Sequence, residues 1–130
     1  MMLLNSSGAP YKYPATHSGF GTQFVGLQGY SNTHTTIQQT LANIPTNVSL
    51  TLELVACYRH GYSGVPITTI SLGGTVVMST ADVLKTVDVE PNWGTFTASV
   101  VCATSNPVLQ LDAVHPSDAT LFVSRLRLLH

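Results

Sequence analysis

The chain has 130 residues, of which 44% are hydrophobic and only 8% are charged. This length and hydrophobicity fit one domain with a buried core and exclude a disordered chain. The formal net charge is −1, and five lysine and arginine residues supply all the positive charge, which argues against phosphate contacts and so against nucleic-acid binding. No apolar run is long enough to insert into a membrane.

The low charge also bears on the surface of the domain. Typical soluble domains carry about 25% charged residues, whereas serine and threonine supply most of the polar groups here. Threonine favours β-structure. So few charges indicate that part of the surface is covered by neighbouring chains.

Residues 1–20 are rich in Ser, Gly, Pro and Tyr and show no periodicity. They predict an extended N-terminal arm or linker, followed by a β-sandwich domain over residues 21–130. The first ten residues lack the charged region and the long apolar run of a secretory signal peptide.

From residue 21 onward, polar and apolar residues alternate. Residues 21–29 and 35–41 form two such segments, and in the second Gln39 falls on the apolar side with Ile37 and Leu41. We expect this buried amide to find structural hydrogen-bond partners. Residues 49–59 give the strongest pattern, with Leu at 50, 52 and 54 opposite a face that carries Glu53 and Arg59. A period of two over this length predicts a strand and fixes its register.

Further strands follow at short spacing. Residues 67–72 lead through Gly73-Gly74 into residues 75–79, as in a two-residue hairpin. Three more strands are predicted at 94–103, 107–113 and 120–129, the last with Phe122, Leu126 and Leu128 on one side. The only helix candidate, residues 79–87, is too short to carry a fold. About eight short strands predict an all-β, antiparallel β-sandwich or barrel.

Two cysteines, Cys57 and Cys102, fall inside predicted strands. They can form one disulfide or remain two buried thiols, and the sequence leaves both alternatives open. Asn5 and Asn47 each begin a glycosylation sequon and are candidate glycosylation sites.

Seven sequence pieces follow one another in a recognisable order: FVGLQG, TIQQTLANIP, SLTLELVACYR, GGTVV, NWGTFTASVV, VLQLDA and TLFVSRLRL. In order and spacing they resemble the carbohydrate-binding modules of the galactose-binding-like jelly-roll class, over residues 21–129. The resemblance implies an antiparallel jelly roll and a non-catalytic, lectin-like function.

One position departs from that pattern. The closing strand of such modules usually carries an aspartate near its middle, and Ser124 occupies the matching place here. A calcium site or buried polar network built on that aspartate is therefore in doubt. We expect no cofactor, and the sequence does not support calcium.

No catalytic motif is present. The sequence has no Gly-x-Ser-x-Gly elbow, no His-Glu-x-x-His helix and no glycine-rich phosphate loop. Its six carboxylates are scattered, and its five histidines show no metal-ligand spacing. We therefore predict no catalytic residues, no metal site and no enzymatic activity.

Saccharide binding suits the residues that follow the strands. Aromatic faces stack on sugar C–H groups, while planar Arg, His, Asn and Gln groups read hydroxyl pairs. Such residues gather at strand ends and in loops, where binding groups concentrate on a rigid scaffold. The predicted ligand-binding residues are Gln28, Tyr30, Arg59, His60, Tyr62, Asn92 and Trp93.

Several of these residues also have a structural interpretation. Tyr58 lies on the leucine face and is expected in the core. Trp93 is equally suited to packing over the edge of the sandwich. Arg59 could pair with Glu53 on the same strand face, and His60 could be a turn residue.

A competing function is a structural or assembly subunit of a large particle, such as a virion or a cell-surface assembly. Jelly rolls also build viral capsids, and residues 1–20 would then contact neighbouring subunits through Tyr11, Tyr13 and Phe20. Under either hypothesis the partners are glycans or protein chains, and an extracellular, cell-surface or virion location is favoured over the cytoplasm.

Overall fold

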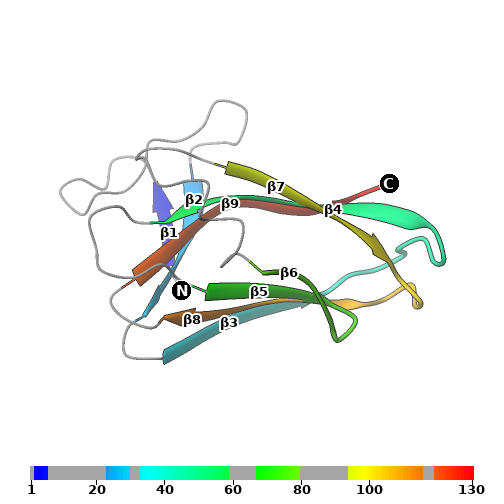
Figure 1. The fold of residues 1–130 in the computed structure, drawn as a ribbon, viewed down its shortest axis with the longest axis horizontal. Helices are drawn as coiled ribbons and strands as arrows, with labels where there is room; N and C mark the ends of the chain where they lie inside the picture. Colours follow the sequence, from blue (N-terminus) through cyan, green and yellow to red (C-terminus); the bar gives the residue numbers. More distant parts are fainter. Residues whose placement is uncertain (1, 6–22, 30–32, 59–66, 80–93, 116–118) are drawn as a thin grey trace.

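The computed structural model describes residues 2–5, 23–29, 33–58, 67–79, 94–115 and 119–130 (Figure 1). Within these ranges the chain forms nine β-strands. In chain order they are β1 (Met2–Asn5), β2 (Gln23–Gly29), β3 (Thr33–Thr40), β4 (Ser49–Tyr58), β5 (Ile67–Leu72), β6 (Thr75–Ser79), β7 (Gly94–Val101), β8 (Val108–His115) and β9 (Ala119–Leu129). No helix in this part of the chain is long and apolar enough to cross a membrane.

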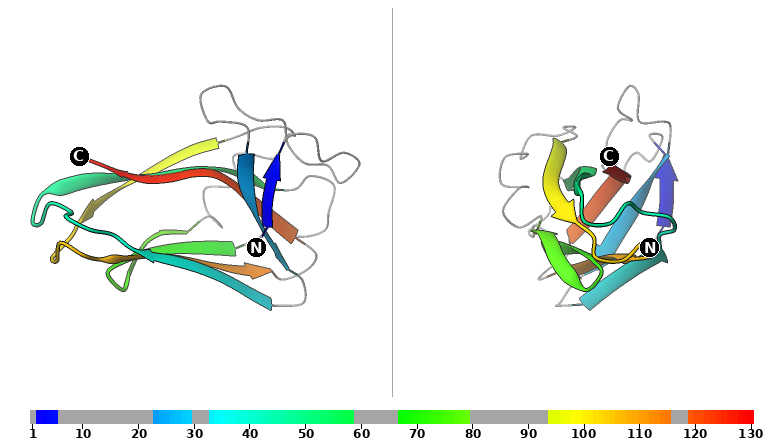
Figure 2. Two further views of the ribbon diagram at one scale, coloured as in Figure 1. Left: turned by 180° about the vertical axis from the view of Figure 1, so that it is seen from behind. Right: turned by 90° about the vertical axis from the view of Figure 1, so that its right-hand side faces the viewer.

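The strands make two stacked antiparallel sheets, which Figure 2 shows from two sides. One sheet has five strands in the order β1-β2-β9-β4-β7, and the other has four in the order β3-β8-β5-β6. Most sequential strands lie in opposite sheets, as in a jelly roll, and the exceptions are β1-β2 and β5-β6, which are neighbours in one sheet. The all-β sandwich predicted from the alternation is therefore confirmed.

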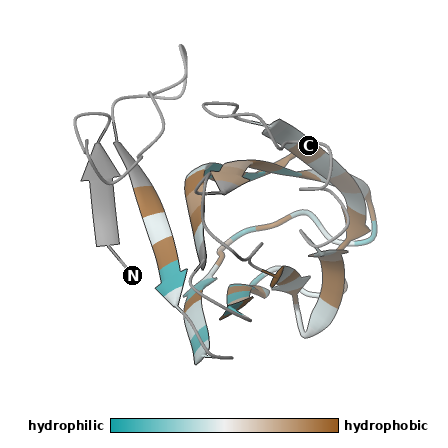
Figure 3. Cartoon of the chain, turned by 60° about the vertical axis from the view of Figure 1, so that its left-hand side comes forward, coloured by the Kyte–Doolittle hydropathy of each residue, from teal (hydrophilic) through white to brown (hydrophobic). Residues whose placement is uncertain are grey.

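The core lies between the sheets and is built from the alternating apolar positions (Figure 3). Leu52 and Leu54 of β4 are fully buried, as are Leu27 of β2, Ile70 of β5 and Leu121 of β9. Each such side chain contributes about 1.5–3 kcal/mol through removal from water. Glu53, between the two leucines, points to the outer face, so the predicted register of β4 is the observed one.

A β-bulge breaks the pairing of β4 with β9. Val55 pairs with Arg125 but Ala56 pairs with Val123, which leaves Ser124 as the extra residue of β9. A bulge reverses the side on which later residues point. Leu126 consequently faces the core, whereas Phe122 faces the opposite side of the sheet and is fully buried there. The expectation that Phe122 shares a face with Leu126 and Leu128 was wrong because the period-two pattern contains no sign of the extra residue.

The hairpin between β5 and β6 is confirmed. Leu72 pairs with Thr75 across Gly73 and Gly74, whose φ angles are +60° and +84°. Positive φ at both central residues is the signature of a type I′ turn, and glycine reaches it without the steric penalty of a Cβ.

Two expectations need revision at the sheet edges. Residues 2–5, expected in the N-terminal arm, form β1 and pair with β2, so this part of the arm belongs to the sandwich. Gln39 is exposed, not buried, because β3 is an edge strand of its sheet. Residues 6–20 of the arm, and residues 80–87 of the helix candidate, lie outside the described residues.

Both cysteines are buried thiols, and no disulfide joins them. Cys57 lies near the end of β4, whereas Cys102 follows Val101, which pairs with Ser49 at the start of β4. Eight residues of strand, about 26 Å, therefore separate them, far more than the roughly 7 Å limit between the Cα atoms of a disulfide. The sequence left open a disulfide or two buried thiols, and the structure shows two buried thiols.

Candidate functional site

Most of the predicted ligand-binding residues lie outside the described residues. Gln28 is described: its side chain is exposed next to the end of β2, and its backbone oxygen accepts a hydrogen bond from Thr35 Oγ1 at 3.3 Å. Those outside are Tyr30, Arg59, His60, Tyr62, Asn92 and Trp93. The side chain of Tyr58, expected in the core, is likewise not described.

The strands that flank these residues do end together. β2 ends at Gly29 and β4 ends at Tyr58, both at the left of Figure 1, and β7 begins at Gly94, above them and nearer the middle of the picture. Gly94 of β7 pairs with Ala56 of β4. Strand β9 lies between β2 and β4 and pairs with both of them. With about 4.8 Å between neighbouring strands, the three ends span roughly 14 Å across the strands. The register also offsets Gly94 along them, because Gly29 is level with Ala119 of β9 and Gly94 with Val123.

Buried polar residues form the base of this end of the sandwich. His115, the last residue of β8, and Thr68 of β5 are both fully buried. The His115 ring packs against Gly29 so closely that a Cβ there would lie 2.5 Å from its Cδ2 and would also meet Thr33 Oγ1. The end of β2 in one sheet therefore packs directly against the start of β3 and the end of β8 in the other. The sequence signal was available: His115 continues the alternation of Leu109, Leu111 and Ala113 on the core face.

The opposite end of the sandwich is closed by backbone hydrogen bonds. The amides of Leu41, Ile44 and Asn47 donate to the carbonyl oxygens of Pro107, Ser105 and Cys102 at 2.9 Å each. Asn47 is exposed there with φ of +58°, so its sequon is on the surface, and glycosylation at this asparagine stays a prediction. Asn5 ends β1, and its side chain is not described.

Among the described residues, Asp112 places a carboxylate on the outer face of the four-stranded sheet. Thr36 Oγ1 donates to Asp112 Oδ1 at 2.7 Å from the neighbouring strand, and His34 Nδ1 lies 3.4 Å from both carboxylate oxygens. His34 is largely exposed. These contacts join edge strand β3 to β8 at the surface of the sheet, where both the His34 and the Asp112 side chains are partly exposed to solvent.

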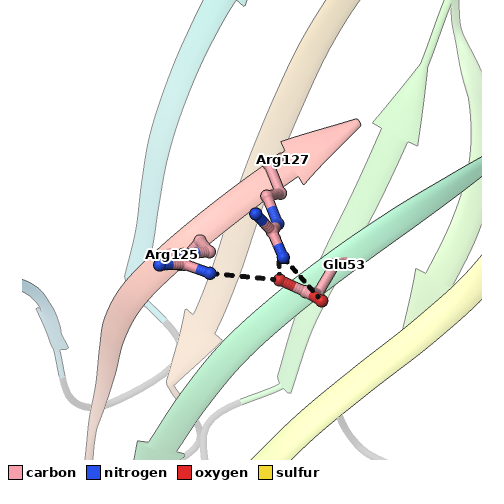
Figure 4. Close-up of polar contacts among 3 residues, drawn as sticks. All are labelled: Glu53, Arg125 and Arg127. Atoms are coloured by element: carbon pink, nitrogen blue, oxygen red, sulfur yellow. Dashed lines mark hydrogen bonds and ion pairs between the residues drawn. The ribbon is translucent and has the colours of Figure 1, made fainter. Parts of the chain in front are cut away.

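The outer face of the five-stranded sheet carries a second polar group, shown in Figure 4. Arg127 of β9 binds Glu53 of β4 in a fork: Nε donates to Oε1 at 2.7 Å and Nη2 donates to Oε2 at 3.3 Å. Arg125 Nη1 lies 3.8 Å from the same Oε1. Glu53, which the sequence offered as a partner for Arg59, thus contacts two arginines of β9. Arg59 lies outside the described residues, so its own pairing stays a prediction.

The described residues contain no pair of carboxylates facing one cleft and no cluster of metal ligands. Glu53 and Asp112 are on the outer faces of opposite sheets, so they do not face one cleft as the carboxylates of a glycosidase must. No three His, Cys, Asp or Glu side chains among the described residues gather to hold a metal.

Comparisons with known proteins identify the fold. No family model and no curated protein matches the sequence. Among solved structures, the C-terminal domain of the sugar-binding protein EclA superposes with a TM-score of 0.59 at 10% identity, covering 96% of this chain and 89% of that one.

Two carbohydrate-binding modules are comparably similar. The C-terminal CBM6 of LamC, a marine laminarinase from Zobellia galactanivorans, has a TM-score of 0.58 at 16% identity, with 99% and 98% coverage. A family 35 carbohydrate-binding module from an environmental isolate has a TM-score of 0.56 at 12% identity, with 100% and 93% coverage. The resemblance expected from the order of the strands is thereby confirmed at the level of the fold.

Proposed function

We propose that the protein is a non-catalytic saccharide-binding module whose ligand is held at the end of the sandwich where β2 and β4 end and β7 begins. The observation that carries the proposal is the convergence of these strand ends. The residues that would hold the ligand lie in the sequence at the end of β2 or within four residues of the end of β2 or β4 or the start of β7. They are Gln28, Tyr30, Arg59, His60, Tyr62, Asn92 and Trp93.

The chemistry of this end favours a sugar over other ligands. It combines aromatic rings with planar donors and acceptors, which together bind the apolar faces and the hydroxyl pairs of a pyranose. A span of roughly 14 Å across three strand spacings is wide enough for a short oligosaccharide. The close fit of Gly29 against His115 supplies a rigid base below it.

The similar structures support the same ligand class. One is named as a sugar-binding protein and two as carbohydrate-binding modules. A fold hosts many functions, so the likeness supports the proposal, and the test is made on the residues of this chain.

The single tryptophan gives the experiment a specific signal. A glycan array with the full chain selects a saccharide, which is then titrated against tryptophan fluorescence. Stacking on Trp93 should give a saturable change in emission. Arg59→Ala and Trp93→Ala should each weaken binding about tenfold or more, as loss of an aromatic or charged anchor does. We expect binding to persist in EDTA.

The matched control is Thr46→Ala, an exposed position at the opposite end of the sandwich, which should bind as the unmodified chain does. Unchanged binding by both Arg59→Ala and Trp93→Ala would contradict the proposed site. Absence of saccharide binding, together with concentration-dependent association in light scattering, would favour an assembly subunit that contacts its neighbours through residues 1–20.

A further inference from the structure

Strand β3 lacks the features with which proteins usually protect the edge of a sheet. It lies at the outer edge of the four-stranded sheet, and within the described part of the chain its residues 34–40 pair with β8 alone (Figure 1). The pairing runs through the strand without a bulge. The strand contains no Pro, Lys, Arg, Asp or Glu, whereas short length, bulges, proline and charged side chains are the common means of blocking an edge. The outer edge of β3 is therefore a template for another strand.

Two of the other edge strands are shielded in these ways. β1 has only four residues, and β6 has five residues with a register shift in its pairing with β5. The fourth edge strand, β7, is as long, as regular and as free of charge as β3. It is therefore the natural comparison for β3.

The core-facing sides of these two strands differ. β7 turns apolar side chains toward the core, as an ordinary strand of a sandwich does. β3 turns Thr35, Ile37 and Gln39 that way, so polar side chains flank its single apolar one, and Gln39 is exposed there. A polar and apolar mixture on this side suits a surface that meets another chain better than it suits a core.

An apolar groove lies beside β3, between the two sheets. It has a volume of about 220 Å³ and is lined by Ile37, Gln38, Gln39, Leu109, Leu111 and Leu126. β9 pairs with β2 only over residues 119–123, so at Leu126 its one described neighbour is β4. Ile37 and Leu126 are only half-buried in consequence. A further strand on the edge of β3 would extend the sheet over this groove and cover both side chains.

The sequence of β3 is complementary to itself when two copies run antiparallel about Ile37. Opposed residues of such a pair point to the same side of the sheet and contact each other. The opposed pairs are then Ile37–Ile37, Gln39–Thr35, Gln38–Thr36 and Thr40–His34. Each polar pair can match a donor with an acceptor, and no like charges meet. The only apolar side chain of the strand meets its own copy at the mouth of the groove.

We propose that β3 is a self-association surface, on which a second copy of this chain pairs its own β3 antiparallel about Ile37, so that two four-stranded sheets become one continuous sheet. A pairing over residues 34–40 spans about 24 Å and adds about six to eight backbone hydrogen bonds. An interface of this size is small, so the dimer is weak and reversible. It goes beyond the saccharide site at the end of the sandwich and stands independently of it.

Sedimentation of the full chain over a concentration series measures the association. The weight-average mass should rise reversibly from that of the monomer toward twice that value, between about 1 μM and 1 mM for a small interface. Gln39→Lys should weaken the dimer about tenfold or more, because the partner strand would bury its charge. The matched control is Ser99→Lys, which places the same charge on an exposed position of β7 and should leave the dimer unchanged.

Introduced cysteines test the register. With Ile37 at the centre, the two Ile37 Cα atoms lie about 4.5–5.5 Å apart, within the range of a disulfide, so oxidation of Ile37→Cys should give a covalent dimer. The two Gln39 Cα atoms would be more than about 13 Å apart, so Gln39→Cys alone should not crosslink. A mixture of Gln39→Cys and Thr35→Cys should crosslink, because those positions oppose each other. The native cysteines are buried and do not compete.

Three results would overturn the proposal. A monomer mass at every concentration excludes a second copy and leaves a foreign strand as the occupant of this edge. Association that Gln39→Lys leaves unchanged, or that Ser99→Lys weakens equally, points to β7 or to residues 1–20 instead. Crosslinking of Gln39→Cys as fast as that of Ile37→Cys contradicts the register. If Ile37→Cys does not fold, the mixture of Gln39→Cys and Thr35→Cys decides.

Discussion

Gly29 is the position where a single methyl group should disturb the base of the candidate site. In Gly29→Ala the new Cβ would lie 2.5 Å from His115 Cδ2 and 2.9 Å from its Cγ, and it would also meet Thr33 Oγ1. The imidazole must recede to the 3.4 Å of an ordinary contact. It is fully buried, so it can recede only by displacing its neighbours or by losing its packing.

The expected cost follows from this geometry. Overpacking a well-packed interior typically costs about 1–3 kcal/mol. Because the ring is fully buried and Thr33 blocks a second direction, we expect the upper part of that range, about 2–3 kcal/mol. For a chain of this length the melting temperature should fall by roughly 6–12 °C.

Urea unfolding of four proteins tests the reasoning: the unmodified chain, Gly29→Ala, His115→Ala and the double variant. The double-mutant cycle isolates the contact between the two residues. Without the imidazole the new Cβ still meets Thr33 Oγ1, so part of the cost remains, but Gly29→Ala should cost about 1–2 kcal/mol less than in the unmodified chain. This difference is the coupling free energy of the two positions. Equal costs in both backgrounds, or a cost below about 0.5 kcal/mol in the unmodified chain, would refute the contact.

Three further predictions concern the scaffold. Phe122→Ala should lower the free energy of unfolding by about 3–5 kcal/mol, because the ring is fully buried, and urea denaturation measures this. Gly74→Ala should cost about 1–2 kcal/mol through its φ of +84° alone, since no atom lies within 4 Å of the new Cβ, and Gly74→Asn should cost less in the same assay. Cys57 and Cys102 should react with a thiol reagent only after unfolding and without prior reduction; a reductant requirement would contradict the absence of a disulfide between them.

The alternation of residues was sufficient to predict the interior strands. In β4 the leucines at 50, 52 and 54 sit on the core face and Glu53 on the outer face, because side chains of a strand point to opposite sides in turn. The Gly73-Gly74 turn was also predictable, since positive φ at two successive residues is a local requirement that glycine meets.

Features set by distant pairing were not predictable. Residues 2–5 form β1 only through their partner β2, and the bulge at Ser124 exists only in the pairing of β9 with β4. The same bulge turns Phe122 away from Leu126, which the pattern of β9 alone could not indicate. Gln39 was misplaced because an edge position depends on the order of strands in the sheet.

The candidate site was predictable as chemistry more than as geometry. Loop residues obey no periodic pattern, so the sequence could name Arg59 and Trp93 as ligand groups without placing them relative to each other. The fork of Arg127 on Glu53 was missed for a related reason: the partners come from strands that are far apart in the chain and meet only through sheet register.

Amide chemical-shift mapping with a bound neutral oligosaccharide tests the central claim most directly. We predict that perturbations concentrate at Gln28, Gly29 and Gly94 and in the segments that follow β2 and β4 or precede β7. Saturable perturbations at the opposite end instead, in residues 41–48 and 102–107, would contradict the account, as would a chain whose spectrum no saccharide alters.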